Sequence, residues 1–132
     1  MAKILVIEDR SSLRALYQIV LGRLEHEVSL APTGEAGVEA ALRLQPDLVI
    51  MDLLLPGISG PEAARQLEEA GILPAAPLII TTAMDYDKAR TVAASLGACA
   101  VLAKPFDIDA LLATVQDALS ASPQLPAGPP QS

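Results

Sequence analysis

The sequence contains a single cysteine, Cys99, and no long run of apolar residues. One cysteine excludes a disulfide within the chain. We expect Cys99 to pack in the core, because its neighbours are small and apolar and none is basic, as a reactive thiol would require. The longest apolar runs fall short of the roughly 18–20 residues that span a bilayer. The N-terminus reaches acidic residues at position 8, unlike a signal peptide. We therefore expect a cytoplasmic protein with no membrane association.

Basic residues are also scarce. The 132 residues include 9 Lys and Arg against 16 Asp and Glu, which gives a net charge of −7. Such a surface repels phosphate backbones, so we expect no direct nucleic-acid binding. His26 is the only histidine and the sequence has no G-x-S-x-G turn, so a serine hydrolase would lack both its nucleophile and its base. We expect His26 to lie in a solvent-facing loop, away from any site.

Segments with the periods of strands and helices alternate along the chain. The apolar run LVIM at 48–51 suits a strand buried on both faces, whereas Leu13, Leu16 and Val20 recur at helical spacing. We expect strands at 3–7, 27–31, 47–51, 77–81 and 98–102. We expect a helix after each strand, at about 11–24, 33–45, 61–70, 85–96 and 107–119, the first of them capped by Ser11 or Ser12.

Five successive strand–helix units predict an α/β fold, namely a (βα)5 doubly wound five-stranded parallel sheet. Right-handed crossovers between parallel strands place helices on both faces of such a sheet. The pattern stops near residue 120, and residues 120–132 contain four prolines and no charged residue. We therefore expect one folded domain over 1–119, followed by a disordered tail or linker remnant over 120–132.

Polar residues follow four of the five predicted strands. Because parallel strands end at one edge of the sheet, these residues are expected to gather there, at Glu8, Asp9, Asp52, Thr81, Thr82 and Lys104. Converging carboxylates suit a hard cation such as Mg²⁺, and a lysine beside them can neutralise a phosphoryl group that a carboxylate accepts. Each acid alone could simply mark the start of a loop. The combination from separate strand ends favours a phosphoryl-transfer site.

The segments KILVIEDR, DLVIMDLLLPGISG, PLIITTA and LAKPF, in this order, resemble the receiver domain of bacterial two-component response regulators over residues 2–119. The resemblance implies a flavodoxin-like fold with strand order 2-1-3-4-5. It further implies that Asp52 is the phosphoacceptor, and that Mg²⁺ is held by Glu8, Asp9, Asp52 and the main-chain carbonyl of Leu54. Thr82 would be the switch hydroxyl and Lys104 the phosphate-contacting lysine, with a cis peptide bond before Pro105.

Two positions depart from the family pattern. Family members usually carry Tyr or Phe where this chain has Val101, and an acid is common where it has Arg10. A valine cannot move a large ring between buried and exposed positions, so the usual aromatic relay from Thr82 is expected to be missing. Arg10 could contact a carboxylate, steer phosphate or be a solvated residue at a helix entry.

The resemblance implies a sensor histidine kinase or phosphotransfer protein as phosphoryl donor and a protein target downstream. The target would bind the face of the fourth helix, fifth strand and fifth helix, and weak homodimers are compatible with it. No output domain is expected after residue 119, so the chain would act alone or derive from a longer regulator. Two alternatives stay open here: a receiver fold that serves as an interaction module without phosphorylation, and a small hydrolase or phosphatase.

Overall fold

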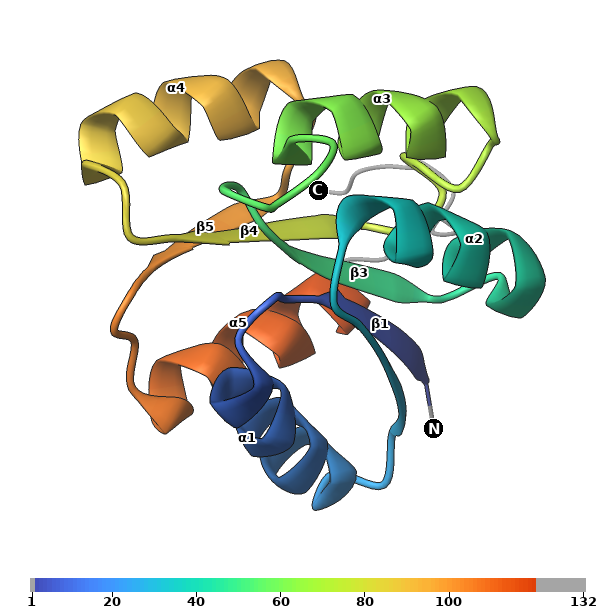
Figure 1. Cartoon of the computed structure of the whole chain (residues 1–132). Coiled ribbons are helices and arrows are strands. Elements are labelled where there is room, and N and C mark those ends of the chain that lie inside the picture. Colours follow the sequence, from blue (N-terminus) through green and yellow to red (C-terminus); the bar gives the residue numbers. More distant parts are fainter. Residues whose placement is uncertain (1, 121–132) are drawn as a thin grey trace, which may run out of the picture.

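The structure is a computed structural model that describes residues 2–120. It contains a five-stranded parallel sheet in the order β2-β1-β3-β4-β5, with helices on both faces (Figure 1). The strands are β1 (Lys3–Ile7), β2 (Glu27–Ala31), β3 (Leu48–Asp52), β4 (Leu78–Thr82) and β5 (Ala100–Ala103). Both the predicted fold class and the predicted strand order are confirmed.

Five helices alternate with the strands: α1 (Ser11–Gly22), α2 (Gly34–Leu44), α3 (Gly60–Glu69), α4 (Tyr86–Ser95) and α5 (Ile108–Ser120). Figure 1 shows α2, α3 and α4 on one face of the sheet and α1 and α5 on the other. Among residues 2–120, no helix has the length and apolar content needed to cross a bilayer. The tail predicted from residue 120 lies outside the described residues, except that Ser120 ends α5.

The core consists of two layers, one on each face of the sheet. Along β3, Val49 and Met51 pack under α2, α3 and α4, whereas Leu48 and Ile50 pack against α1 and α5. Successive side chains of a strand point to opposite faces, so an uninterrupted apolar run fills both layers. All five residues of β3 are buried, and Asp52 is the last of them, at the carboxyl-terminal end of the strand.

Several element boundaries differ from the predicted ones. Ser11 and Ser12 do not cap α1; Arg10 occupies the N-cap position and no side chain caps it. The third helix begins at Gly60, one residue earlier than predicted, because the hydroxyl of Ser59 accepts a hydrogen bond from the Glu62 amide. The fifth strand begins only at Ala100.

The parallel register brings the polar strand ends together. Ile7 pairs with Met51, and Asp52 pairs with Thr81 on the next strand. Thr82 in turn pairs with Ala103, the residue before Lys104. The peptide bond between Lys104 and Pro105 is cis, as predicted, and a second cis bond precedes Pro74. The carboxyl-terminal edge of the sheet therefore carries the polar residues that the sequence placed there.

Candidate functional site

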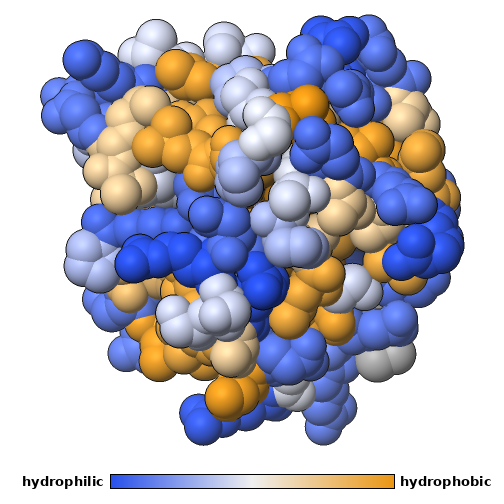
Figure 2. Space-filling model, viewed as in Figure 1, coloured by the Kyte–Doolittle hydropathy of each residue, from blue (hydrophilic) through white to orange (hydrophobic). Residues whose placement is uncertain are grey.

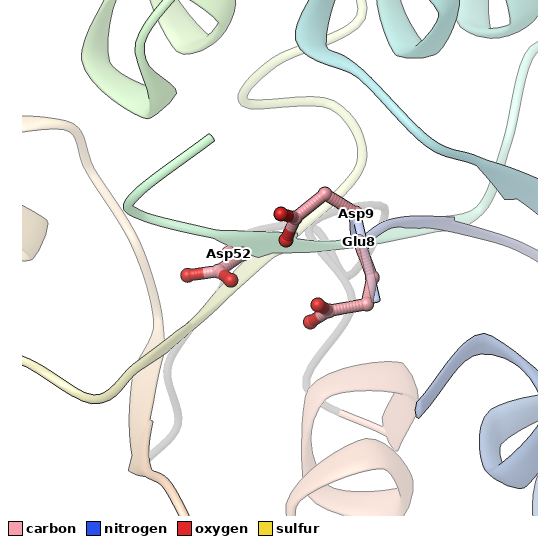
Figure 3. Close-up of side chains that lie close together, drawn as sticks. All are labelled: Glu8, Asp9 and Asp52. Atoms are coloured by element: carbon pink, nitrogen blue, oxygen red, sulfur yellow. The ribbon is translucent and has the colours of Figure 1, made fainter. Parts of the chain in front are cut away.

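Three carboxylates converge at the carboxyl-terminal edge of the sheet. Glu8 and Asp9 follow β1, Asp52 ends β3, and the three side chains lie close together (Figure 3). One oxygen from each carboxylate lies within 4.8 Å of the others. Glu8 is 1 % and Asp52 6 % exposed, whereas Asp9 is exposed. The cluster is thus open to solvent on the side of Asp9.

Main-chain contacts fix the position of Glu8. Its amide donates to the carbonyl of Ala31 at 2.9 Å, and its Oε2 accepts from the amide of Arg10 at 3.0 Å. Nη1 of Arg14 donates to the Glu8 carbonyl at 2.9 Å. This role of Arg14 was not predicted from the sequence. The contact could have been predicted from the expected helix, because side chains in the first turn of a helix lie beside the loop that precedes it.

Both carboxylate oxygens of Asp52 are engaged. Oδ2 accepts from Nζ of Lys104 at 2.7 Å, and Oδ1 accepts from the amide of Leu54 at 3.1 Å. The amide between them, that of Leu53, donates to the carbonyl of Thr81 at 2.9 Å. These bonds hold the start of the β3–α3 loop (residues 53–59) against the end of the sheet, and they fix Leu54 next to the carboxylates.

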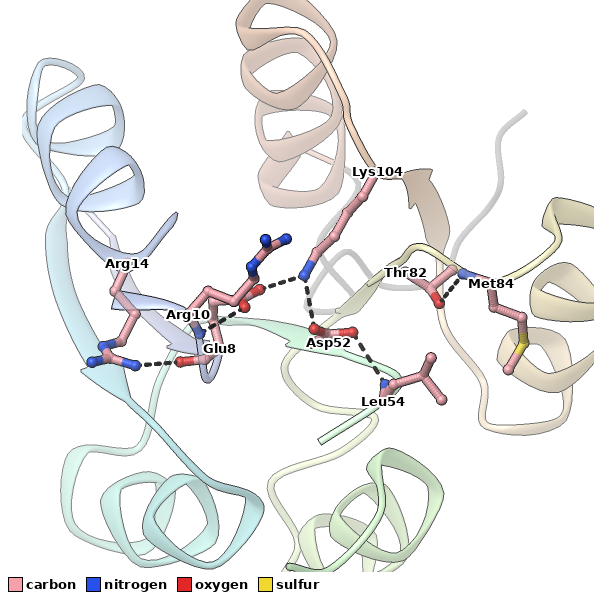
Figure 4. A network of polar contacts seen from close by, with 8 residues as sticks. All are labelled: Glu8, Arg10, Arg14, Asp52, Leu54, Thr82, Met84 and Lys104. Carbon is pink, nitrogen blue, oxygen red and sulfur yellow. Dashed lines mark hydrogen bonds and ion pairs between the residues drawn. The ribbon is translucent and has the colours of Figure 1, made fainter. Parts of the chain in front are cut away.

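Lys104 bridges the two buried carboxylates. Its Nζ lies 2.8 Å from Oε1 of Glu8 and 2.7 Å from Oδ2 of Asp52, and its side chain is only 10 % exposed (Figure 4). Burial of the ammonium lowers its pKa, but the hydrogen bonds to Asp52 and Glu8 outweigh that effect and raise the pKa above 10.5. One ammonium faces three carboxylates, so the cluster keeps an excess of negative charge.

The two predicted threonines lie in different surroundings. Thr82 is buried beside the carboxylate cluster. Its Oγ1 accepts from the amide of Met84 at 3.0 Å and makes no bond to Asp52 within residues 2–120 (Figure 4). The Thr81 side chain instead faces Tyr17 of α1, whose pKa burial raises above 10.0. The Thr81 hydroxyl is fully buried, whereas Figure 4 shows the Thr82 side chain beside Asp52, so of the two threonines only Thr82 is at the site.

Other residues singled out from the sequence lie away from the carboxylates. Cys99 is exposed, so its prediction as a core residue is wrong. It precedes β5, an edge strand that pairs only with β4, so Cys99 itself is exposed although its neighbours Ala98 and Ala100 pack partly against the core. His26 is half-buried at the opposite end of the sheet, where Nδ1 accepts from the amide of Ala2 at 3.2 Å. Val101 is half-buried and packs against the α2–α4 layer.

The surface around the site is hydrophilic between apolar borders. In the view of Figure 2, a band of hydrophilic residues crosses the left of the molecule at the level of the sheet, with hydrophobic residues above and below it. Beside Lys104, a hollow of about 340 Å³ is lined mainly by apolar side chains, those of Leu13, Leu16, Ala83, Pro105 and Phe106, with Arg10 at its border. The charged pocket is therefore flanked by an apolar depression.

Comparison with known proteins identifies the family. Residues 4–116 match the response regulator receiver domain. Protein PilH of Pseudomonas aeruginosa is 34 % identical over 120 residues, which cover 91 % of this chain and 99 % of PilH. Response regulator ArlR of Staphylococcus saprophyticus is 37 % identical over 125 residues, 94 % of this chain. The chain spans 55 % of the length of ArlR.

Solved structures agree with this match. Chemotaxis protein CheY4 of Vibrio cholerae superposes with a TM-score of 0.84 at 27 % identity, covering 90 % of this chain and 99 % of CheY4. The receiver domain of a sensor histidine kinase from Pseudomonas aeruginosa superposes with a TM-score of 0.82 at 28 % identity, covering 91 % and 98 %. That structure is described with a magnesium ion coordinated in its active-site cleft. This chain belongs to the response regulator receiver domains, the signalling modules of two-component systems.

Proposed function

We propose that this chain is a phosphoacceptor receiver, phosphorylated on Asp52 by the phosphohistidine of a sensor histidine kinase or phosphotransfer protein. The observation that carries the proposal is the position of Asp52. Its carboxylate ends a fully buried strand, is held by Lys104 at 2.7 Å, and lies within 4.8 Å of two further carboxylates. A carboxylate in a mostly buried, negatively charged cluster is costly for stability alone, which favours a functional role.

The donor set fits Mg²⁺. Glu8, Asp9 and Asp52 offer oxygen ligands, the type that this cation prefers, and Lys104 alone does not balance their charge. We assign these three carboxylates and the main-chain carbonyl of Leu54 as the residues that would hold the ion. When bound, Mg²⁺ would neutralise charge on the phosphoryl oxygens.

In the transfer step, an oxygen of Asp52 attacks the phosphorus of the donor phosphohistidine. The new O–P bond makes an acyl phosphate while the N–P bond breaks, and the released imidazole nitrogen keeps the electron pair and takes a proton from solvent. Lys104 already contacts Asp52 and can follow the phosphoryl oxygens as a point charge. Within residues 2–120, the hydroxyl of Thr82 accepts one hydrogen bond, from the amide of Met84, and donates none, so its hydrogen would be available to the phosphoryl group.

The apolar hollow beside Lys104 supports a protein as the phosphoryl donor. It adjoins the carboxylate cluster and is lined by Leu13, Leu16 and Phe106, which suits a protein partner, because apolar side chains buried in such pockets carry much of the binding energy of an interface. We further propose a downstream protein target, no direct nucleic-acid contact and a cytoplasmic location, all on the strength of the family assignment and the net charge of −7. The chain would then catalyse only its own phosphorylation and dephosphorylation.

The test is incubation with acetyl phosphate and Mg²⁺, followed by intact-protein mass spectrometry. We expect one phosphoryl adduct in the wild type and none in Asp52→Asn, and we expect omission of Mg²⁺ to suppress the adduct. A wild type that stays unmodified would refute the proposal and would favour the alternative function, an interaction module that works without phosphorylation. An adduct that persists in Asp52→Asn would place the acceptor elsewhere.

A further inference from the structure

The β3–α3 loop carries the proposed carbonyl ligand of Leu54 and is held at both of its ends by its own neighbours. Leu54 bonds to Asp52 at the start, and at the end the amide of Gly60 donates to the carbonyl of Leu53 at 3.2 Å. The middle of the loop has no such partner within the loop. Within residues 2–120, one side chain from another element hydrogen-bonds to it, namely Glu35 in the first turn of α2.

Glu35 lies against the loop in two ways. Its Oε2 accepts a hydrogen bond from the amide of Ile58 at 3.2 Å. A Cβ placed on Gly57 would lie only 2.7 Å and 2.8 Å from the two Glu35 oxygens, so the carboxylate rests directly on the Gly57 backbone. Gly57 has φ +75°, a conformation that glycine adopts without strain. The turn at 57–58 therefore presents its backbone to this carboxylate.

Gly34, the residue before Glu35, also lies against the turn at 57–58. A Cβ on Gly34 would lie 2.7 Å from Cγ1 of Ile58 and 3.2 Å from its carbonyl oxygen. A side chain at position 34 would therefore press on Ile58, which would have to shift, so the glycine lets the start of α2 lie close to the turn at 57–58. The approach is set by packing as well as by the hydrogen bond.

The same segment also reaches the other half of the acidic site. Ala31, at the end of β2, accepts the amide hydrogen of Glu8 through its carbonyl at 2.9 Å. Thr33 then caps α2 by accepting from the Ala36 amide at 3.0 Å. Residues 31–35 therefore link the backbone of one carboxylate to the loop that carries the proposed carbonyl ligand.

We propose that Glu35 is a positioning residue for the metal site: it holds the middle of the β3–α3 loop so that Leu54 faces Glu8, Asp9 and Asp52. This inference rests on the proposed function, since it concerns affinity for Mg²⁺ at that site. Within residues 2–120, Glu35 forms no hydrogen bond to the three carboxylates of the site. It would act on them through the backbone of the loop. Because this hydrogen bond is exposed to solvent and acts on the ion only through the loop, we expect its loss to weaken Mg²⁺ binding about three- to tenfold, less than the full value of a hydrogen bond to a charged group.

The experiment is calorimetric titration of Mg²⁺ into wild type, Glu35→Ala, Glu35→Gln and Glu39→Ala. Glu39 lies on the same helix, is exposed, and its side chain forms no hydrogen bond in the described chain, so its alanine variant matches the charge change without the loop contact. Glutamine keeps an acceptor oxygen. We expect about three- to tenfold weaker binding for Glu35→Ala only, with the other two variants within about twofold of wild type.

Amide hydrogen exchange supplies a direct readout of the contact. The Ile58 amide should exchange faster in Glu35→Ala than in Glu39→Ala, and melting temperatures without Mg²⁺ should agree because both sites are exposed. Equal Mg²⁺ affinities for Glu35→Ala and Glu39→Ala, or no recovery in Glu35→Gln, would overturn the inference while leaving the proposed function intact. Absence of Mg²⁺ binding by the wild type would overturn both.

Discussion

Replacement of Lys104 by methionine removes the only ammonium that contacts the buried carboxylates within residues 2–120. Methionine has similar length and keeps the apolar contacts of the lysine stem. Glu8 and Asp52 would remain 1 % and 6 % exposed, with oxygens within 4.8 Å of each other and no counter-charge. We therefore expect Lys104→Met to destabilise the protein in the absence of divalent cations.

The magnitude follows from the distances. At 2.7 Å and 2.8 Å, each attraction amounts to about 6 kcal/mol with an effective dielectric constant of about 20, before desolvation offsets most of it. Removing one partner of a buried pair costs about 3–5 kcal/mol. We take about 3 kcal/mol, because the cluster opens to solvent at Asp9. For a domain of this size, that value lowers the melting temperature by roughly 10 °C.

The assay is thermal unfolding followed by circular dichroism at neutral pH, with EDTA and then with Mg²⁺. Lys88→Met on α4 is the matched control, because Lys88 is exposed and forms no ion pair in the described residues; it should leave the melting temperature almost unchanged. Mg²⁺ should narrow the gap between wild type and Lys104→Met, since a cation replaces the missing positive charge and stabilises the state that binds it.

The pH dependence has a defined sign. The folded-state pKa of Lys104 lies above its ordinary 10.5, so the contribution of the lysine to stability is complete below that pH and is lost as the pH rises through the folded-state pKa. The gap between the two proteins in EDTA should therefore stay constant between about pH 7 and 10 and shrink above that range. A melting temperature for Lys104→Met equal to that of wild type at pH 7, or a gap that Mg²⁺ leaves unchanged, would refute the reasoning.

Three further predictions concern Asp52, Asp9 and Val101. Asp52→Asn should keep the fold, with a melting temperature in EDTA equal to or slightly above that of wild type. The substitution relieves repulsion among the acids while Glu8 still pairs with Lys104. A melting temperature lower by several degrees would mean that Asp52 has a structural role instead. Asp9→Ala should remove most of the Mg²⁺-induced rise in melting temperature, and an undiminished rise would exclude Asp9 as a ligand. Because Val101 is small and stiff, beryllofluoride should shift amide resonances strongly in the loops at the site and only modestly over residues 85–103; equally large shifts there would indicate another route of switching.

Much of the fold could be predicted because its signals are local. The apolar run at 48–51 identifies a strand buried on both faces, and five strands alternating with helices leave a parallel sheet as the consistent arrangement. Because parallel strands end at the same edge of a sheet, the acids at the ends of β1 and β3 could be predicted to lie together. The element boundaries were less certain: Ser59 caps α3 as a serine should, but Ser11 and Ser12 do not cap α1.

The boundary of α1 was set by a contact outside the helix. The carboxylate of Glu8 takes the amide of Arg10, and Arg14 folds back onto the Glu8 carbonyl, so the turn is organised around the buried acid rather than around a serine cap. Cys99 was misplaced for a similar reason. Its small neighbours suggest a core, yet the edge position of β5 leaves it exposed, and the order of strands is not a local property.

The sequence by itself determined the periodicity, the order of the elements and the kind of polar residue at each strand end. Only the tertiary structure decided which side chains meet. Lys104 reaches Glu8 across 96 residues of chain, and Glu35 reaches Ile58 across 23. Glu35 and Glu39 are indistinguishable in sequence, both glutamates on one helix, but only Glu35 faces a turn whose glycine permits the approach. The physical reason is that hydrophobic periods report on one segment at a time, whereas a hydrogen bond between segments depends on strand register and on the close packing of the loops between them.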